Sequence, residues 1–293
     1  MAKKYSKNEM KRKSAVKFLI AIFTVILIIC VSFFIFVGTK NYIVSEKIDD
    51  SAKNQSDDVV KNSTPIVVNN VIVGAVYNGK WVASQSYYFR NDKKNIDVDV
   101  YTEDGKKGKY KLTSQEKDTA TSTMYAYVNT PDRASEFIAV ASSDKDIMPE
   151  PAKKEVDVDN IDIKEVKKAL GIYGILNSSV KINSIHDVTL NQNNIGRIFC
   201  ITNEVGKYSG GYSAVIYIAN TGESKIIKYS YVKNFKKSSD WPIYSFKFIA
   251  DLNNDGTNEV IIQEVKEFEA KYDIIEFKND NFIEVLSSEL KFK

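Results

Sequence analysis

The chain has 293 residues, of which 43% are hydrophobic and 27% are charged, so it is long enough for two folded units with apolar cores. Its formal net charge of +3 is unevenly distributed, because residues 1–17 carry seven basic side chains and one acidic one and the rest of the chain carries −3. A slightly acidic remainder lacks the clustered basic face of a nucleic-acid-binding domain, and a single histidine excludes zinc sites built from several histidines.

The first element is an apolar segment that follows the basic tail 1–17. Residues 18–37 read FLIAIFTVILIICVSFFIFV and contain no charged side chain. A helix of about twenty residues spans roughly 30 Å, the thickness of the hydrocarbon core of a bilayer. We therefore expect a transmembrane helix over 18–38, with the lipid bilayer as its partner. A cleaved signal peptide is the alternative, but IFVGTKNYI, at the end of the run, is a poor cleavage site.

The basic tail sets the orientation of this helix. By the positive-inside rule the amino terminus lies in the cytoplasm, and everything after the helix lies outside. The sequence thus predicts a single-pass protein of the cell membrane. Residues 39–63 are polar and almost free of aromatic side chains, so they are expected to form a linker.

Residues 64–148 have the pattern of a β-rich domain. Asn78-Gly79 lies between two runs of β-branched residues, which is a strong signal for a β-hairpin. In NIDVDVYT, apolar residues at 96, 98 and 100 alternate with Asp97 and Asp99, which predicts a strand with one buried face. About six strands are expected here, and they fit a small barrel, such as an SH3-like one, or a meander.

A second domain is expected over 161–293, after a linker at 149–160 that contains two prolines. Its helix is predicted from the capping-box spacing of Asp162 and Glu165, and from Gly171 at the position of a C-terminal cap. Ile163, Val166 and Leu170 would form its buried face. Seven strands are predicted after the helix: IGRIFCIT, YSAVIYIA, KIIKYSYV, IYSFKFIA, EVIIQEVKEF, YDIIEF and FIEVL.

One loop of this second domain carries a candidate metal site. In DLNNDGTNEVII, Asp251, Asn253 and Asp255 alternate, Gly256 permits a sharp turn, and Thr257 and Glu259 follow at the same spacing. These are positions one, three, five, seven and nine of a calcium loop, all with hard oxygen ligands. An EF-hand is excluded, because position twelve is Ile262 and a strand pattern follows. A polar turn without metal is the alternative interpretation.

Residues of about 244–263, including FKFIADLNNDGTNEVIIQ, resemble the calcium loop of FG-GAP or VCBS-type repeats, which has the pattern D-x-[DN]-x-D-G-x-x-[DE] between two strands. The resemblance implies structural calcium, with the following ligands: Asp251, Asn253, Asp255, Thr257 and Glu259. The motif occurs once over 251–259, whereas the extracellular β-propellers that carry such loops need several blades. The resemblance is therefore restricted to the loop.

No catalytic residue and no organic cofactor site are assigned, because the chain lacks a nucleophile motif and a glycine-rich phosphate loop. Cys200 in RIFCIT is expected to be a small buried residue, and His186 a structural or surface one. We expect a non-enzymatic protein that presents two β-rich modules for binding or assembly. Trp81 and Trp241 leave a carbohydrate or cell-wall binder as an alternative, although core positions suit both. A hydrolase with two carboxylates is a further alternative.

Overall fold

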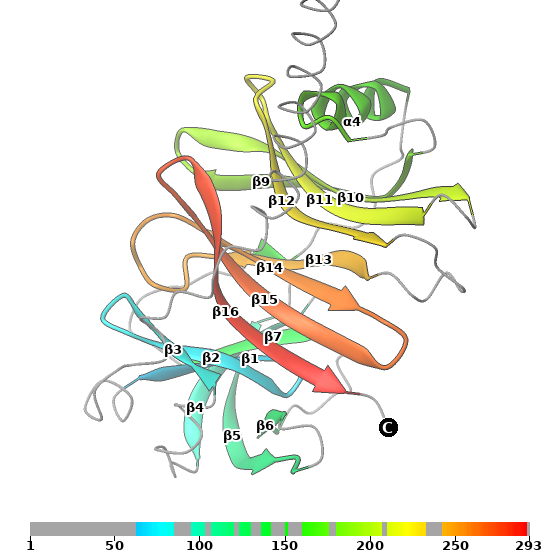
Figure 1. The fold of residues 1–293 in the computed structure, drawn as a ribbon. Coiled ribbons are helices and arrows are strands. Elements are labelled where there is room, and N and C mark those ends of the chain that lie inside the picture. The colour runs from blue at the N-terminus through cyan, green and yellow to red at the C-terminus, as the bar shows by residue number, and fades with distance from the viewer. Residues whose placement is uncertain are drawn as a thin grey trace, which may run out of the picture. The chain divides into compact units, whose positions relative to one another are not determined.

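The computed structural model describes residues 63–84, 95–102, 107–119, 123–129, 136–141, 150–151, 160–175, 180–206, 210–232 and 242–291. All of them belong to one compact unit. Its layers are a helix, a four-stranded sheet, a five-stranded sheet and a β-barrel (Figure 1). For this part of the chain, the predicted mainly β architecture with a covering helix and a small barrel is confirmed.

The predicted membrane segment cannot be compared with the structure in the same way. The tail 1–17 and the segment 18–38 lie outside the described residues, as does nearly all of the linker. Within the ranges given above, no helix is both long enough and apolar enough to cross a membrane. The transmembrane helix therefore stays a prediction.

The barrel is formed by the first strands of the chain. Their bounds are β1 (Thr64–Val68), β2 (Val71–Tyr77), β3 (Lys80–Ala83), β4 (Ile96–Thr102), β5 (Lys107–Lys117), β6 (Met124–Val128) and β7 (Phe137–Ala141). The order β1-β7-β4-β5-β6-β2 closes on itself because β1 also pairs with β2, while β3 extends β2 as a hairpin. Alternate apolar side chains fill the interior, among them Val67, Ile72, Leu112 and Met124.

Two local predictions in the barrel have different outcomes. The β2–β3 hairpin is confirmed, because Asn78 and Gly79 have φ of 49° and 73° as a tight hairpin turn requires. In β4, Val98 and Val100 are buried as expected, but Asp99 is also buried, although an outward position was predicted. The reason is tertiary: Tyr101, on the same face of β4 as Asp99, belongs to an apolar cluster shared with the five-stranded sheet.

The four-stranded sheet consists of β9 (Val180–Asn191), β10 (Asn194–Gly206), β11 (Gly210–Ala219) and β12 (Ser224–Val232), which pair in chain order. One face packs under the helix α4 (Asn160–Ile172) and the other against the five-stranded sheet. Strand β9 was not predicted. It is an edge strand with a largely polar first half, so its sequence lacks the apolar run that marks the other strands.

Helix α4 buries Val166 and Leu170 as predicted, but its ends differ from the expectation. The helix begins at Asn160, two residues before Asp162, so the proposed capping box is wrong. Asp162 and Glu165 instead accept hydrogen bonds from Arg197 of β10, each at 2.5 Å. These contacts tie the first turns of the helix to the sheet.

The carboxyl end of α4 is closed by a different glycine from the one predicted. Gly171 lies inside the helix, whereas Gly174 has a φ of 68°. The N–H of Gly174 donates to the carbonyl of Gly171 at 3.1 Å, and the N–H of Ile175 donates to the carbonyl of Leu170 at 3.0 Å. This pair of bonds is a Schellman motif, in which glycine supplies the left-handed residue.

The five-stranded sheet lies between the other two β-layers. Its strands are β8 (Glu150–Pro151), β13 (Ile243–Ala250), β14 (Glu259–Val265), β15 (Glu269–Lys278) and β16 (Asn281–Lys291), in the order β16-β15-β14-β13-β8. Strand β8 falls in the predicted linker 149–160 and pairs with Phe248 and Ile249 of β13. The sheet has apolar neighbours on both faces, and β14 accordingly carries the unbroken apolar run Val260, Ile261 and Ile262.

One apolar cluster joins the barrel to this sheet. It contains Trp81 and Ile138 of the barrel together with Phe248, Ile274 and Leu286 of the sheet. Polar contacts cross the same interface: the amide of Asn69 donates to the hydroxyl of Tyr272 at 3.0 Å, and Lys247 pairs with Glu136 at 2.5 Å. The predicted domains 64–148 and 161–293 therefore share an interface.

Candidate metal centre

The loop between β13 and β14 is wound tightly by its own side chains. The carboxylate of Asp251 accepts the backbone N–H groups of Asp255 at 3.1 Å and Gly256 at 3.0 Å. Asn253 also accepts the N–H of Asp255, and Asp255 accepts the N–H of Thr257. Gly256 has a φ of 85°, which L side chains rarely adopt. The acidic and amide oxygens predicted as ligands thus turn toward the inside of the loop.

Neighbouring elements hold this loop on two sides. Leu252 is buried in the apolar cluster that joins the sheet to the barrel. The β2–β3 turn of the barrel also lies close to the loop, because a Cβ added to Gly79 would be 3.7 Å from the carbonyl of Asn253. At the other end, Asn258 bonds to β9 through the carbonyls of Thr189 and Leu190, each at 2.7 Å. The loop is therefore a fixed part of the fold rather than a free surface turn.

Glu259, the first residue of β14, is the most deeply buried member of the predicted ligand set. Its exposed fraction is 0%. Oε2 accepts the N–H of Leu252 at 2.7 Å, whereas the buried Oε1 has no hydrogen-bond partner in the described part of the chain. Burial raises the pKa of Glu259 well above its usual value, and the charges of Asp255, Asp251 and Glu276 raise it further. Within the described ranges, no basic side chain forms an ion pair with this buried carboxylate.

The structure adds one acid that sequence reasoning missed. Glu276 of β15 is buried, and its carboxylate lies with those of Asp255 and Glu259 so that one oxygen of each falls within 4.8 Å of the others. Burial raises the pKa of Glu276, and the charge of Asp255 adds to the effect, although Lys278 opposes it. The only sequence signal was an acid inside the apolar run YDIIEF, which becomes informative once strand register is known.

The predicted ligands are therefore brought together in part. Asp255 and Glu259 converge with Glu276, while Asp251 binds backbone N–H groups across the loop and is close enough to raise the pKa of Glu259. Asn253 donates its amide to Asp255 at 3.1 Å and to Glu276 at 3.3 Å. The ligand atoms that converge here are carboxylate oxygens, which suit Ca²⁺ or Mg²⁺ rather than zinc, whereas Asn253 turns its NH2 group toward them. The residues present fit a hard cation.

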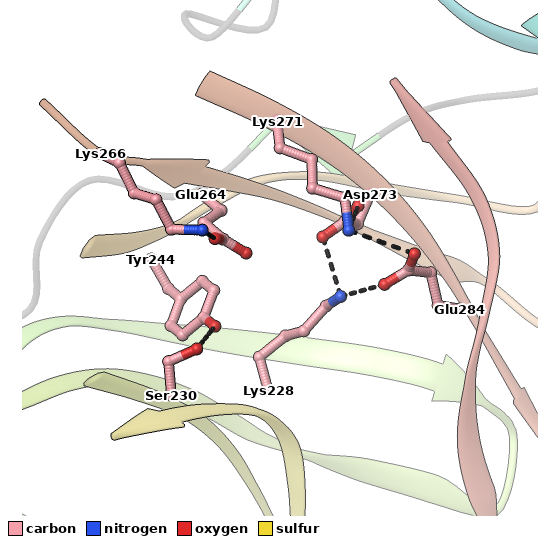
Figure 2. A network of polar contacts seen from close by, with 8 residues as sticks. All are labelled: Lys228, Ser230, Tyr244, Glu264, Lys266, Lys271, Asp273 and Glu284. Atoms are coloured by element: carbon pink, nitrogen blue, oxygen red, sulfur yellow. Dashed lines mark hydrogen bonds and ion pairs between the residues drawn. The ribbon is translucent and has the colours of Figure 1, made fainter. Parts of the chain in front are cut away.

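A second buried group of charges lies on the opposite face of the same sheet (Figure 2). Asp273 of β15, with 0% of its side chain exposed, pairs with Lys228 of β12 at 2.8 Å and with Lys271 at 3.0 Å. Glu284 of β16 also contacts both lysines. Two acids and two lysines thus balance each other between the two sheets. This arrangement occupies the carboxylates and is typical of a structural ion-pair network.

The pKa directions agree with that assignment. Burial alone would lower the pKa of Lys228, but the carboxylates of Asp273 and Glu284 outweigh it and raise the pKa. The pKa of Lys271 is raised in the same way, against both burial and the charge of Lys228. Beside the network, Tyr244 shares a hydrogen bond of 2.8 Å with Ser230, and burial raises its pKa.

Other residues singled out in the sequence have structural surroundings. Cys200 is buried, and burial raises the pKa of its thiol to about 11, so it is the small core residue that was expected. His186 is buried and stacks on Phe246, with ring centroids 4.6 Å apart. Trp81 is only 6% exposed and packs in the cluster between barrel and sheet. Trp241 lies outside the described residues.

Comparison with known proteins adds no family to these observations. No protein-family model, no curated protein and no solved structure matches the chain. The resemblance of residues 244–263 to an FG-GAP or VCBS-type loop therefore rests on the loop sequence.

Proposed function

We propose that this chain is a non-catalytic, membrane-anchored protein that presents its β-rich part outside the cell for binding or assembly and holds a structural calcium ion in the loop 251–259. The observation that carries the calcium part is the unpartnered oxygen of Glu259, which is fully buried beside other carboxylates. A buried charge of this kind is costly unless a cation or proton matches it. The predicted ligands Asp251, Asn253, Asp255, Thr257 and Glu259 supply the oxygens.

Calcium suits the proposed location. The segment 18–38 would anchor the chain in the bilayer, and the basic tail 1–17 would keep the amino terminus in the cytoplasm. Calcium outside cells is roughly millimolar, which is enough for the weak sites of extracellular modules. A cation bound in the loop would fix the end of β13 to the start of β14. We expect it to stiffen the surface that the protein offers to another surface protein or a cell-wall polymer.

The non-catalytic part is supported by how the charged groups are used. The buried Asp273 and the partly buried Glu284 are both paired with lysines, which leaves neither of them poised as a general acid or base. The carbohydrate alternative loses one of its two tryptophans, because a side chain buried like Trp81 offers no face for stacking on a sugar. Neither alternative gains an observation of its own.

The test is the thermal stability of the full chain, purified in mild detergent, with calcium and with a chelator. Binding to the folded state should raise the free energy of unfolding by about 2.7 kcal/mol when calcium is one hundred times its dissociation constant. Asp255→Ala should abolish this gain, because it removes a charged oxygen from the convergent group. Asp187→Ala, which removes an equal charge from an exposed position on β9, should keep it.

The calcium part of the proposal fails if the unfolding temperature of the wild-type chain is the same in calcium and in chelator. It also fails if Asp187→Ala and Asp255→Ala lose the gain equally, since that would indicate general charge screening rather than a site.

A further inference from the structure

We propose that Glu276 of β15 is a ligand of the same cation, so that the site spans two strands of the sheet instead of residing in the loop alone. This inference rests on the proposed calcium site and extends it. The loop motif does not include Glu276, which lies 17 positions after the last predicted ligand, Glu259. The structure brings the two residues together through strand pairing.

The register of β14 and β15 is what aligns them. The antiparallel pairing runs through Val260 and Ile275, and one further step along it places Glu259 opposite Glu276 on the face toward the barrel. Like charges directly opposite on neighbouring strands destabilise a sheet. Asp255 reaches the same place from the loop, and one oxygen of each of the three acids lies within 4.8 Å of the others. The third acid makes the repulsion larger unless a cation binds.

The cationic group near Glu276 is not a full substitute for a metal ion. Lys278 lies 3.6 Å from Glu276, but its side chain is 60% exposed, so solvent screens the pair. The amide of Asn253 donates to Glu276 at 3.3 Å and carries no formal charge. Neither group reaches Oε1 of Glu259 with a hydrogen bond. Among the residues that the structure describes, the buried oxygen of Glu259 therefore still lacks a partner.

Counting Glu276 strengthens the expected preference of the site for Ca²⁺ over Mg²⁺. Asp251, Asp255, Glu259 and Glu276 together supply four carboxylates. Affinity in calcium sites rises with the number of charged ligands, and a carboxylate-rich set of many oxygens suits Ca²⁺ better than Mg²⁺, which keeps water and demands octahedral geometry. A trivalent lanthanide of similar chemistry should bind more tightly still, because it matches more of the negative charge.

The test is a titration of the full chain with Ca²⁺ and with Tb³⁺. Calorimetry measures the affinity for Ca²⁺, and terbium luminescence measures the affinity for Tb³⁺. Glu276→Gln should weaken both cations by about tenfold or more, because it removes one charged ligand. The control is Glu269→Gln at the exposed start of the same strand, which removes an equal charge and should leave both affinities unchanged. Circular dichroism in chelator shows whether each variant is folded.

Glu276→Asp separates ligation from simple charge, since it keeps the carboxylate but withdraws it by one methylene. A ligand role predicts weaker binding in Glu276→Asp as well. The inference is overturned if the wild-type chain binds calcium and Glu276→Asp binds it equally well. If the wild-type chain binds neither cation, the proposed calcium site itself is wrong, and that outcome is distinct from the first.

Discussion

The two faces of the five-stranded sheet each carry a buried group of acids, and the two groups are completed in different ways. On the face toward the four-stranded sheet, Asp273 and Glu284 are matched by Lys228 and Lys271 (Figure 2). On the face toward the barrel, Glu259 and Glu276 meet Asp255, with the exposed Lys278 as the cation that the structure places beside them. Strand β15 contributes to both groups.

The difference shows how a structural ion-pair network can be told from a candidate cation site when each contains a fully buried carboxylate. A charge that is paired inside the protein needs nothing from solution, and its removal leaves its partners unmatched. A buried carboxyl group without a partner has a raised pKa, as Glu259 does. A cation that bound beside it would stabilise the folded protein. The same change from carboxylate to amide should therefore have opposite effects on stability at the two places.

The largest effect is expected at the matched group. Asp273→Asn removes the fully buried acid of the network, so the partly buried Lys228 and Lys271 are left with Glu284 alone. Removing one partner of a buried ion pair usually lowers the free energy of unfolding by about 3–5 kcal/mol. We expect a loss of this size in urea unfolding of the full chain, and we expect it to be equal in calcium and in chelator.

The control for this substitution is Asp280→Asn in the exposed turn between β15 and β16, where asparagine accepts the φ of 60° equally well. It should change stability by under about 0.5 kcal/mol. A loss below about 1 kcal/mol in Asp273→Asn would show that the network is solvated and would remove the contrast between the two faces.

A smaller effect of opposite sign is expected at the unmatched group. Glu259→Gln removes a buried charge, keeps an oxygen for the N–H of Leu252 and adds an amide donor toward the neighbouring acids. In chelator we expect the variant to be more stable than the wild type by about 1–2 kcal/mol. In saturating calcium the order should reverse, because the variant has lost a charged ligand. Urea unfolding under both conditions measures the change of sign.

Glu264→Gln on the same strand is the matched control, since its carboxylate pairs with Lys266 at 2.8 Å near the surface. It should leave the calcium gain intact. Should Glu259→Gln destabilise the chelated protein instead, the carboxylate of Glu259 already has an adequate partner and the case for a cation weakens.

The smallest effect concerns alkaline pH and the part of it that the matched group contributes. The pKa values of Lys228, Lys271 and Tyr244 are all raised in the folded protein. Their contribution is therefore complete below the unfolded pKa values, near 10, and is lost as the pH rises above them. Each such group changes stability by at most about 1.4 kcal/mol per pH unit, so we expect these three groups to contribute a loss of about 1 kcal/mol between pH 9 and 10.5.

This loss should be the same in calcium and in chelator, because Lys228, Lys271 and Tyr244 lie on the face of the sheet away from the loop. Tyr244→Phe should reduce the pH dependence, since it removes one titrating group between the sheets while keeping the ring. A loss that appears in chelator and disappears in calcium would assign the alkaline effect to the barrel-facing group instead.

The sequence by itself determined those features that depend on near neighbours in the chain. The Asn78-Gly79 hairpin follows from two residues that accept positive φ, and the buried face of α4 follows from the spacing of Val166 and Leu170. The oxygen alternation of 251–259 likewise indicated where a cation site could form, and Glu259 was named as a candidate ligand. Patterns of this kind are local, so they remain readable without knowledge of the fold.

Tertiary structure alone decided what lies across from each residue. Glu276 joins the loop because β14 and β15 pair in one register, and a shift by one residue would turn it to the other face of the sheet. Asp99 is buried because the outer face of β4 meets the five-stranded sheet, which alternation within one strand cannot show. Strand register and layer order are set by contacts between distant segments, and a single sequence contains no direct record of them.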